Sequence, residues 1–286
     1  MDISRVVVWF SAGVTSAWAL REAVAEYRGR LPVHAVNTDT GSEDEDNYRF
    51  MQDACSWLGV PLEIIKNEKY VDTFAVYDET KFFLKPGIGA KCTFELKRKM
   101  RMRYQNLATD LQVFGYDADE GDRAEFFVKN NPEVRAWFPL VEKGITKLMA
   151  RQMLLDAGIR EPRTYEEGFR NANCLNRGCV KGGVGYWNFM RRARPQVFEA
   201  MARKERELGF CLLRLDKYVD GKRTKVDVFL DELDPSLGNY KMEPSIVCGL
   251  FCGADVPPAP KKVTAKERRK AAANKAYVTD MFDLLK

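Results

Sequence analysis

Short, mainly apolar runs alternate with helix-like stretches over the first 160 residues of the chain. The runs cover residues 6–10, 33–36, 61–65 and 111–114; the first is apolar throughout, and the others each contain one polar residue, His34, Glu63 or Gln112. That pattern is typical of strands buried on both faces of a parallel sheet. Between and after the runs, helical periodicity covers residues 17–25, 44–58, 70–77, 124–129 and 145–157. We therefore expect an α/β fold with a doubly wound parallel sheet.

The periodicity changes near Pro162, where we place a domain boundary. Residues 1–160 form the expected α/β domain, and residues 161–256 a smaller, mostly helical region that carries cysteines. Helices are expected there at 186–190 and 196–208. Residues 257–286 form a tail rich in Lys and Arg. Such a tail either binds nucleic-acid phosphates or is a solvated, mobile end.

Two polar loops follow the first two predicted strands. Residues 11–16, Ser-Ala-Gly-Val-Thr-Ser, connect the first strand to a helix, so backbone N–H groups and hydroxyls can bind an anion there. The equally weighted alternative is an ordinary strand–helix turn. Residues 37–43 follow the second strand and should lie beside the first loop, because ligands bind at the carboxyl ends of parallel strands. In the alternative interpretation, Ser42 simply caps the next helix.

Basic residues gather in the segment 91–103, where Thr93 is expected to cap a helix. The segment either binds anions of a nucleotide or substrate or is a solvated basic face. Arg123 follows the fourth strand and can hold a phosphate or sulfate, or can simply pair with Glu120 one helical turn away.

Histidine and cysteine usage narrows the chemistry. His34 is the only histidine, which excludes sites that need two imidazoles from one chain. Seven cysteines without a secretory signal argue against a disulfide framework. Cys55 and Cys211 are expected in the core. The pairs Cys174/Cys179 and Cys248/Cys252 are candidates for a four-thiolate site, either zinc or an iron–sulfur cluster, with the spacings favouring the cluster. Plain buried thiols are the alternative.

The composition of the 286 residues is that of a soluble globular protein, with 45% hydrophobic and 30% charged residues. No apolar run approaches the about 18 residues that span a bilayer. The amino-terminal residues lack a signal-peptide pattern, so we expect a cytoplasmic protein without membrane contact. The net charge of +5 does not by itself indicate a nucleic-acid-binding protein.

The ordered set of motifs resembles one family. Residues 11–16 are similar to the SGGxxS pyrophosphate loop, with Ala12 at a glycine position and Thr15 where many ATP-using members have Asp. Residues 37–43 resemble the NTGTE segment, 92–97 the CTxxLK motif, and 115–124 the G…ADEGxRA element. The segments around the cysteines resemble NCxxxxCVKGGxGYW and EPxIxCGLFC. The chain thus resembles a PAPS reductase-like protein of the adenine nucleotide alpha-hydrolase (PP-loop ATP pyrophosphatase) superfamily, in an uncharacterised branch of bacteria and phages.

The resemblance implies the HUP-type sheet and ATP or a related adenine nucleotide as cofactor, with Mg²⁺ if ATP is used. It extends residue by residue to three sets. The nucleotide-binding set is Ser11, Gly13, Thr15, Ser16, Asp39, Thr40, Gly41, Ser42 and Gly115. The catalytic set is Cys92, Lys97 and Arg123. The metal set is Cys174, Cys179, Cys248 and Cys252.

Three functions remain open on the sequence. The first is an ATP-dependent enzyme of sulfur chemistry, which adenylates an acceptor, releases pyrophosphate and transfers sulfur with a metal or 4Fe–4S centre. The second is a thiol-dependent reductase of PAPS or a related sulfonucleotide, with Cys248 or Cys92 essential. The third is a non-catalytic nucleotide or nucleic-acid binding module. The acceptor is unidentified, with nucleic acid one option through the basic segments, and a homo-oligomer is one alternative for the assembly.

Overall fold

The computed structural model describes residues 2–85, 89–172, 174–219 and 222–246. Cys248, Cys252 and the basic tail at 257–286 lie outside the described residues. The expectations for them remain predictions.

A five-stranded sheet forms the centre of the fold, in the order β3-β2-β1-β6-β7. Its strands are β1 (Arg5–Trp9), β2 (Val33–Asp39), β3 (Leu62–Lys66), β6 (Asp110–Val113) and β7 (Ala136–Trp137). Every neighbouring pair is parallel. This confirms the expected α/β class. Strand β7 was not predicted, because two residues are too few to produce a sequence pattern.

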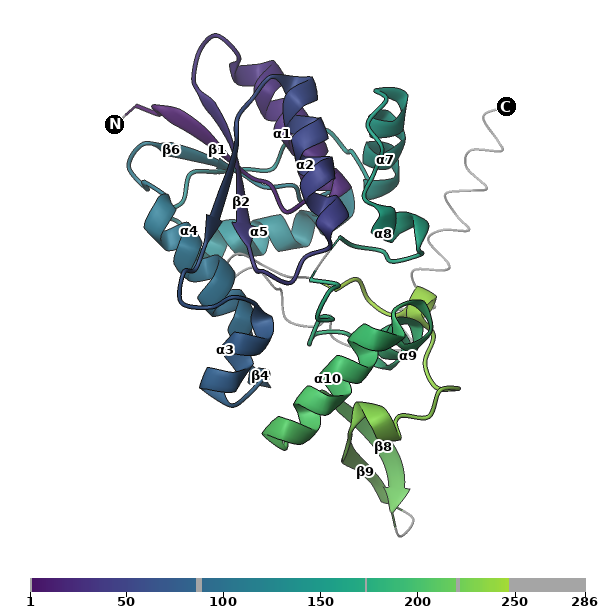
Figure 1. The fold of residues 1–286 in the computed structure, drawn as a ribbon. Coiled ribbons are helices and arrows are strands. Elements are labelled where there is room, and N and C mark those ends of the chain that lie inside the picture. Colours follow the sequence, from purple (N-terminus) through teal and green to yellow (C-terminus); the bar gives the residue numbers. More distant parts are fainter. Residues whose placement is uncertain (1, 86–88, 173, 220–221, 247–286) are drawn as a thin grey trace, which may run out of the picture. The chain divides into compact units, whose positions relative to one another are not determined.

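Helices cover both faces of the sheet, as a doubly wound topology requires. The helices α1 (Val14–Tyr27), α2 (Glu45–Leu58) and α7 (Lys147–Asp156) pack with Val6 and Val8 of β1. The alternate residues Val7 and Trp9 pack toward α5 (Gly121–Asn130). Figure 1 shows α1 and α2 together beside the strands. Burial on both faces explains why residues 6–9 of β1 are uniformly apolar.

The start of α2 differs from the alternative in which Ser42 is the cap. The Asp44 side chain accepts a hydrogen bond from the Asp46 N–H, while the Ser42 hydroxyl contacts the Thr73 hydroxyl at 3.0 Å. Asp44 is the better cap because its carboxylate also complements the helix dipole.

The basic segment is a π-helix, η1 (Thr93–Arg98), that continues into α4 (Lys99–Tyr104). The predicted cap, Thr93, instead lies inside the first turn and is buried, and Cys92 stands before the helix without a capping bond. Helix α3 (Thr73–Thr80) and the short strands β4 (Leu84–Lys85) and β5 (Gly89–Ala90) precede it. π-Helical turns are frequent at functional sites.

The remaining described elements are mainly helical. They are η2 (Ala118–Glu120), α6 (Pro139–Glu142), α8 (Arg163–Glu166), α9 (Val184–Ala193), α10 (Pro195–Leu208), β8 (Leu213–Val219), β9 (Lys222–Val228), η3 (Leu230–Glu232) and η4 (Tyr240–Met242). The antiparallel β8–β9 hairpin was not predicted. Most of β9 is exposed, so it lacks the apolar signal of the central strands. No helix in the described part of the chain is both long and apolar enough to cross a membrane.

Candidate functional site

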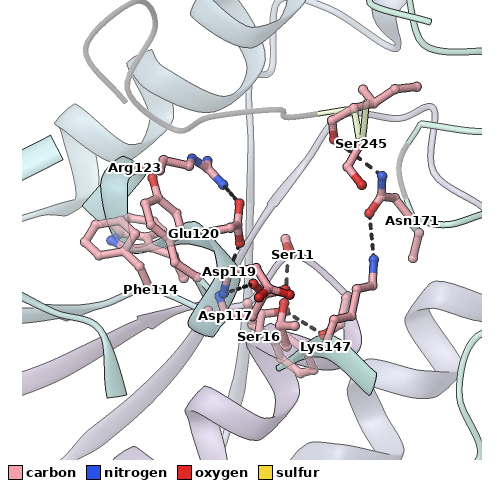
Figure 2. A pocket seen from close by; sticks show the side chains of 18 of the residues that line it. Ser11, Ser16, Phe114, Asp117, Asp119, Glu120, Arg123, Lys147, Asn171 and Ser245 are labelled. Carbon is pink, nitrogen blue, oxygen red and sulfur yellow. Dashed lines mark hydrogen bonds and ion pairs between the residues drawn. The ribbon is translucent and has the colours of Figure 1, made fainter. Parts of the chain in front are cut away.

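A pocket of about 530 Å³ opens beside the carboxyl ends of β1, β2 and β6. Its volume is within the range of small-molecule sites. Figure 2 shows side chains from the β1–α1 loop, from η2 and α5, and from α7 lying around one space. The predicted residues that line it are Ser11, Gly13, Thr15, Ser16, Lys97, Gly115 and Arg123. Seven positions spread over the sequence therefore meet at one place.

The loop from β1 to α1 forms one wall of this pocket. Ala12 has φ +58°, a left-handed conformation that costs an L-residue about 1–2 kcal/mol and that glycine adopts freely. Gly13 precedes α1 without a side-chain capping bond, so the first N–H groups of the helix have no acceptor within the helix. The Ser16 hydroxyl donates to the Gly13 carbonyl at 2.8 Å and lies 3.3 Å from the Ser11 hydroxyl. The loop thus has the geometry of an anion site.

Gly115 follows β6 and supports this loop from beneath. A Cβ atom at position 115 would lie 2.5 Å from the Cα of Ser16 and 2.6 Å from its nitrogen. Only glycine permits that approach of two backbones. Gly115 therefore sets the position of the loop from β1 to α1, and it also lines the pocket.

Arg123 lies flat over the Tyr116 ring, with its guanidinium carbon 3.7 Å from the ring centroid. Its Nη1 also contacts Glu120 at 2.5 Å, the pair expected as the structural alternative. Stacking and pairing orient the guanidinium at the pocket edge (Figure 2). Burial and the neighbouring carboxylates Glu120 and Asp119 raise the pKa of Asp117, which accepts the Asp119 N–H at 3.0 Å.

The predicted nucleotide-binding residues 39–42, at the end of β2, are not among the residues that line the pocket. Thr38, which precedes them, does line it. Asp39 accepts hydrogen bonds from the Gly41 N–H at 2.8 Å and from the Tyr48 hydroxyl at 2.7 Å. The Thr40 hydroxyl lies 3.2 Å from the Cys174 sulfur. Gly41 has φ +64° and passes against the backbone of Val71. In this structure the turn 39–42 connects the sheet to the cysteine segment, and its role in nucleotide binding stays a prediction.

Lys97 lines the large pocket and also a second, small cavity. Its Nζ lies 3.9 Å from Oε1 of Glu43, and both side chains are buried. Burial raises the pKa of Glu43 to about 7, with Lys97 opposing the rise and Asp39 adding to it. The other carboxyl oxygen, Oε2, has no hydrogen-bond partner among the described residues.

The small cavity, of about 20 Å³, is lined by Cys92, Cys174 and Cys179. That is space for about one water or ion. Tyr77 is buried beside these thiols and Cys92 hydrogen-bonds to its hydroxyl; burial and the three cysteines raise the pKa of Tyr77. The structure therefore brings the predicted reactive cysteine together with one predicted ligand pair.

Aromatic rings hold the segment that carries Cys174 and Cys179. A Cβ at Gly178 would lie 2.3 Å from the Trp187 ring, and one at Gly182 would lie 2.0 Å from the Tyr186 ring. The Tyr186 hydroxyl accepts the Cys179 N–H at 2.9 Å. The glycines flanking the cysteines thus allow the backbone to pack closely on α9.

The donor set of the small cavity fits a metal centre held by thiolates, since Cys sulfur binds both zinc and iron–sulfur clusters. Within the part of the chain that the structure describes, no three His, Cys, Asp or Glu side chains are arranged to hold an ion. The second predicted pair, Cys248 and Cys252, lies outside that part.

Several pocket residues were missed at the sequence level. They are Thr38, Asp117, Asp119, Lys147, Tyr165 and Asn171. Asp117 and Asp119 lie within residues 115–124, which resemble the G…ADEGxRA element, and this was a usable signal. Lys147 begins an amphipathic helix, and nothing in its local pattern distinguishes it from a solvent-exposed lysine.

No protein-family model matches the chain, and no curated protein matches it. Among solved structures, a phosphate complex of phosphoadenylyl-sulfate (PAPS) reductase from Candida auris is similar over 60% of this chain and 81% of its own, with 12% identity and a TM-score of 0.41. The U34-tRNA thiolase NcsA from Methanococcus maripaludis, with its [4Fe-4S] cluster, is similar over 73% of this chain and 74% of its own, with 13% identity and a TM-score of 0.41. The structural neighbours of the chain thus include a PAPS reductase and a tRNA thiolase.

Proposed function

We propose that this chain is an adenine-nucleotide-binding enzyme of sulfur chemistry that adenylates an acceptor, releases pyrophosphate and transfers sulfur. The single observation that carries the proposal is Lys97, which lines both the phosphate-loop pocket and the cysteine cavity. One cation can therefore act on a nucleotide and on a thiol or sulfide next to it.

The proposed roles follow from charge and geometry. The loop containing Ser11, Gly13, Thr15 and Ser16 binds phosphate through N–H and hydroxyl donors. Lys97 and Arg123 neutralise the charge that develops when the acceptor attacks the α-phosphorus and pyrophosphate leaves. Sulfide-level sulfur then attacks the acceptor carbon that carries the adenylate, and AMP leaves. The buried Lys97–Glu43 pair keeps the Lys97 ammonium between the two cavities. The acceptor is a nucleic acid in the version that we favour, because Lys and Arg are concentrated in segments 91–103 and 257–286.

Cys174 and Cys179, together with Cys248 and Cys252, would hold the metal centre, and Cys92 lines the same cavity. An iron–sulfur cluster would supply sulfur at the sulfide level, whereas zinc would serve to hold the fold.

The test compares wild type with Lys97→Met, with Lys129→Met as the matched control. Lys129 is exposed on α5, lies outside the basic segments and lines neither cavity. Protein purified without oxygen is assayed for iron, sulfide and zinc, and for pyrophosphate release from ATP with sulfide and small RNA. We expect release in wild type and in Lys129→Met, and at least about a 100-fold loss in Lys97→Met. Absence of pyrophosphate release from wild type under all of these conditions would contradict the proposal.

A second candidate is reduction of PAPS or a related sulfonucleotide by a cysteine thiol. Thr15 in the pocket wall favours it, because the resemblance places Asp there in many ATP-using members. In this case the protein releases sulfite from PAPS without needing a metal, and it releases no pyrophosphate from ATP. Cys92→Ser or Cys248→Ser abolishes sulfite release. If the protein binds a nucleotide but releases neither pyrophosphate nor sulfite, it is a binding module, the third function.

A further inference from the structure

Lys147 is the first residue of α7, and its side chain lies in the wall of the large pocket. Its Nζ donates a hydrogen bond to Oδ1 of Asn171 at 2.8 Å and another to the carbonyl oxygen of Arg170. The ammonium also lies 5.3 Å from the centroid of the Tyr165 ring. Figure 2 shows Lys147 near Ser16 and Asp117, directed toward Asn171.

No carboxylate of a described residue lies within 4.0 Å of the half-buried Lys147 ammonium. Asp117 and Glu120 act on it at longer range, and both have other partners, since Asp117 accepts the Asp119 N–H and Glu120 pairs with Arg123. An ammonium that is partly withdrawn from water among neutral acceptors is stabilised when an anion joins it.

The surroundings of Lys147 are connected to the phosphate loop. Tyr165 packs beneath the ammonium, and its hydroxyl is hydrogen-bonded to the backbone of Val14, the first residue of α1. The same hydroxyl lies 3.8 Å from where a Cβ on Gly13 would be. An anion bound at the loop is therefore close to Lys147 as well.

We propose that Lys147 is an anion-binding residue that holds the outer phosphates of a nucleoside polyphosphate, opposite the loop of residues 11–16. The proposal rests on the proposed function in that it places a nucleotide in this pocket, and it adds the part of the nucleotide that is recognised. AMP lacks these outer phosphates, whereas ATP and inorganic pyrophosphate carry them. Lys147 thus selects polyphosphates over monophosphates.

The charge of Lys147 gives the proposal a pH signature. Burial lowers its pKa to about 8, Asp117 and Glu120 oppose this fall, and Arg151 and Arg170 add to it. As pH rises above about 8, the ammonium loses its proton and its attraction for phosphate. The terminal phosphate is already ionised above about pH 6. ATP affinity should therefore fall between pH 7 and pH 9 in wild type, while an arginine at this position remains charged.

The experiment measures dissociation constants of ATP and AMP by calorimetry for wild type, Lys147→Gln, Lys147→Arg and Lys129→Gln. Lys129 is an exposed lysine on α5 and controls for the loss of one charge. We expect Lys147→Gln to weaken ATP binding about 10- to 100-fold, the range for hydrogen bonds to charged groups, and AMP binding less than about 2-fold. Lys147→Arg should retain ATP binding and lose the decline above pH 8. Thermal unfolding of each variant checks that it is folded.

Equal weakening of ATP and AMP by Lys147→Gln would assign the residue a structural role and overturn the inference, as would no change in either. If wild type binds neither nucleotide, the proposed function fails, and inorganic pyrophosphate alone then tests Lys147. Pyrophosphate binding that Lys147→Gln abolishes supports the inference in that case. Pyrophosphate binding that is absent, or that the variant leaves unchanged, overturns it.

Discussion

At the scale of single residues, Ala12 and Gly115 determine the shape of the loop of residues 11–16, the proposed phosphate loop. Ala12 adopts a left-handed conformation, and Gly115 leaves no room for a Cβ against Ser16. The resemblance has a glycine at position 12, so a methyl group here is tolerated at a cost in backbone strain. Backbone strain at such a position is common at ligand sites. The phosphate loop therefore depends on residues that contribute no functional group.

Two glycine-to-alanine substitutions should have opposite effects on stability. Gly115→Ala should destabilise the fold by about 1–3 kcal/mol, because the new methyl group must displace the first turn of α1. Gly121→Ala should be neutral or stabilise by up to about 1 kcal/mol, because its Cβ meets nothing closer than 3.9 Å in a helical position. Urea unfolding measures both. If the two variants were equally stable, the backbone of Ser16 would have to move aside easily for the new methyl group at position 115.

At the scale of elements, the cysteine segment and α9 form one packed unit. Gly178, Gly182 and Gly183 each lie so close to another group that a Cβ there would collide with it. Trp187 and Tyr186 fill the first two positions, and the Glu243 carboxylate fills the third. Glu243 accepts hydrogen bonds from the N–H groups of Gly185 and Tyr186, at 2.6 and 3.0 Å, and so caps α9.

Removing this cap should destabilise the cysteine segment. Glu243→Ala leaves two N–H groups at the positive end of α9 without their acceptor, at a cost of about 1–2 kcal/mol. Glu199→Ala, at an exposed position on α10, should change stability by less than about 0.5 kcal/mol. Thermal unfolding, together with the alkylation rates of Cys174 and Cys179, measures both effects. Unchanged alkylation and stability in Glu243→Ala would rule out a supporting role for the cap.

At the scale of the whole molecule, buried carboxyl groups couple stability to pH. Burial raises the pKa of Glu205 to about 7, although its oxygens accept the N–H groups of Leu212 and Leu230. Burial also raises the pKa of Glu43 to about 7. Arg49 lowers the pKa of Asp46 to about 2, so the contribution of Asp46 is constant above about pH 4. The two glutamates therefore dominate the neutral range.

The thermal midpoint should fall as pH rises from about 5 to 8. A carboxyl group whose folded pKa exceeds the ordinary value of 4.5 stabilises the fold fully below that value, and this stabilisation is lost as pH passes the folded pKa near 7. Glu205→Gln should flatten the decline, whatever its effect on the midpoint itself. Scanning calorimetry at four pH values measures the slope, with Glu199→Gln as control. An unchanged slope in Glu205→Gln would show that this carboxyl group does not titrate in the range.

The sequence alone predicted the parallel sheet, the order of most strands and helices, and the loop of residues 11–16 that joins β1 to α1. These features follow from local patterns, because a strand buried on both faces must be apolar and a strand–helix turn must expose N–H groups. The weak elements were missed for the same reason: β7 has only two residues, and the β8–β9 hairpin is largely exposed.

Only the tertiary structure decided which side chains share a cavity. Lys97 lines both cavities, Cys92 joins Cys174 and Cys179, and the turn 39–42 faces the cysteine segment instead of the large pocket. These arrangements depend on how segments far apart in the chain pack and on the direction of each side chain, and neither is encoded in local periodicity. Lys147 is the clearest case, since its neutral acceptors at Arg170 and Asn171 and the Tyr165 ring beside it are 18 to 24 residues away in the sequence.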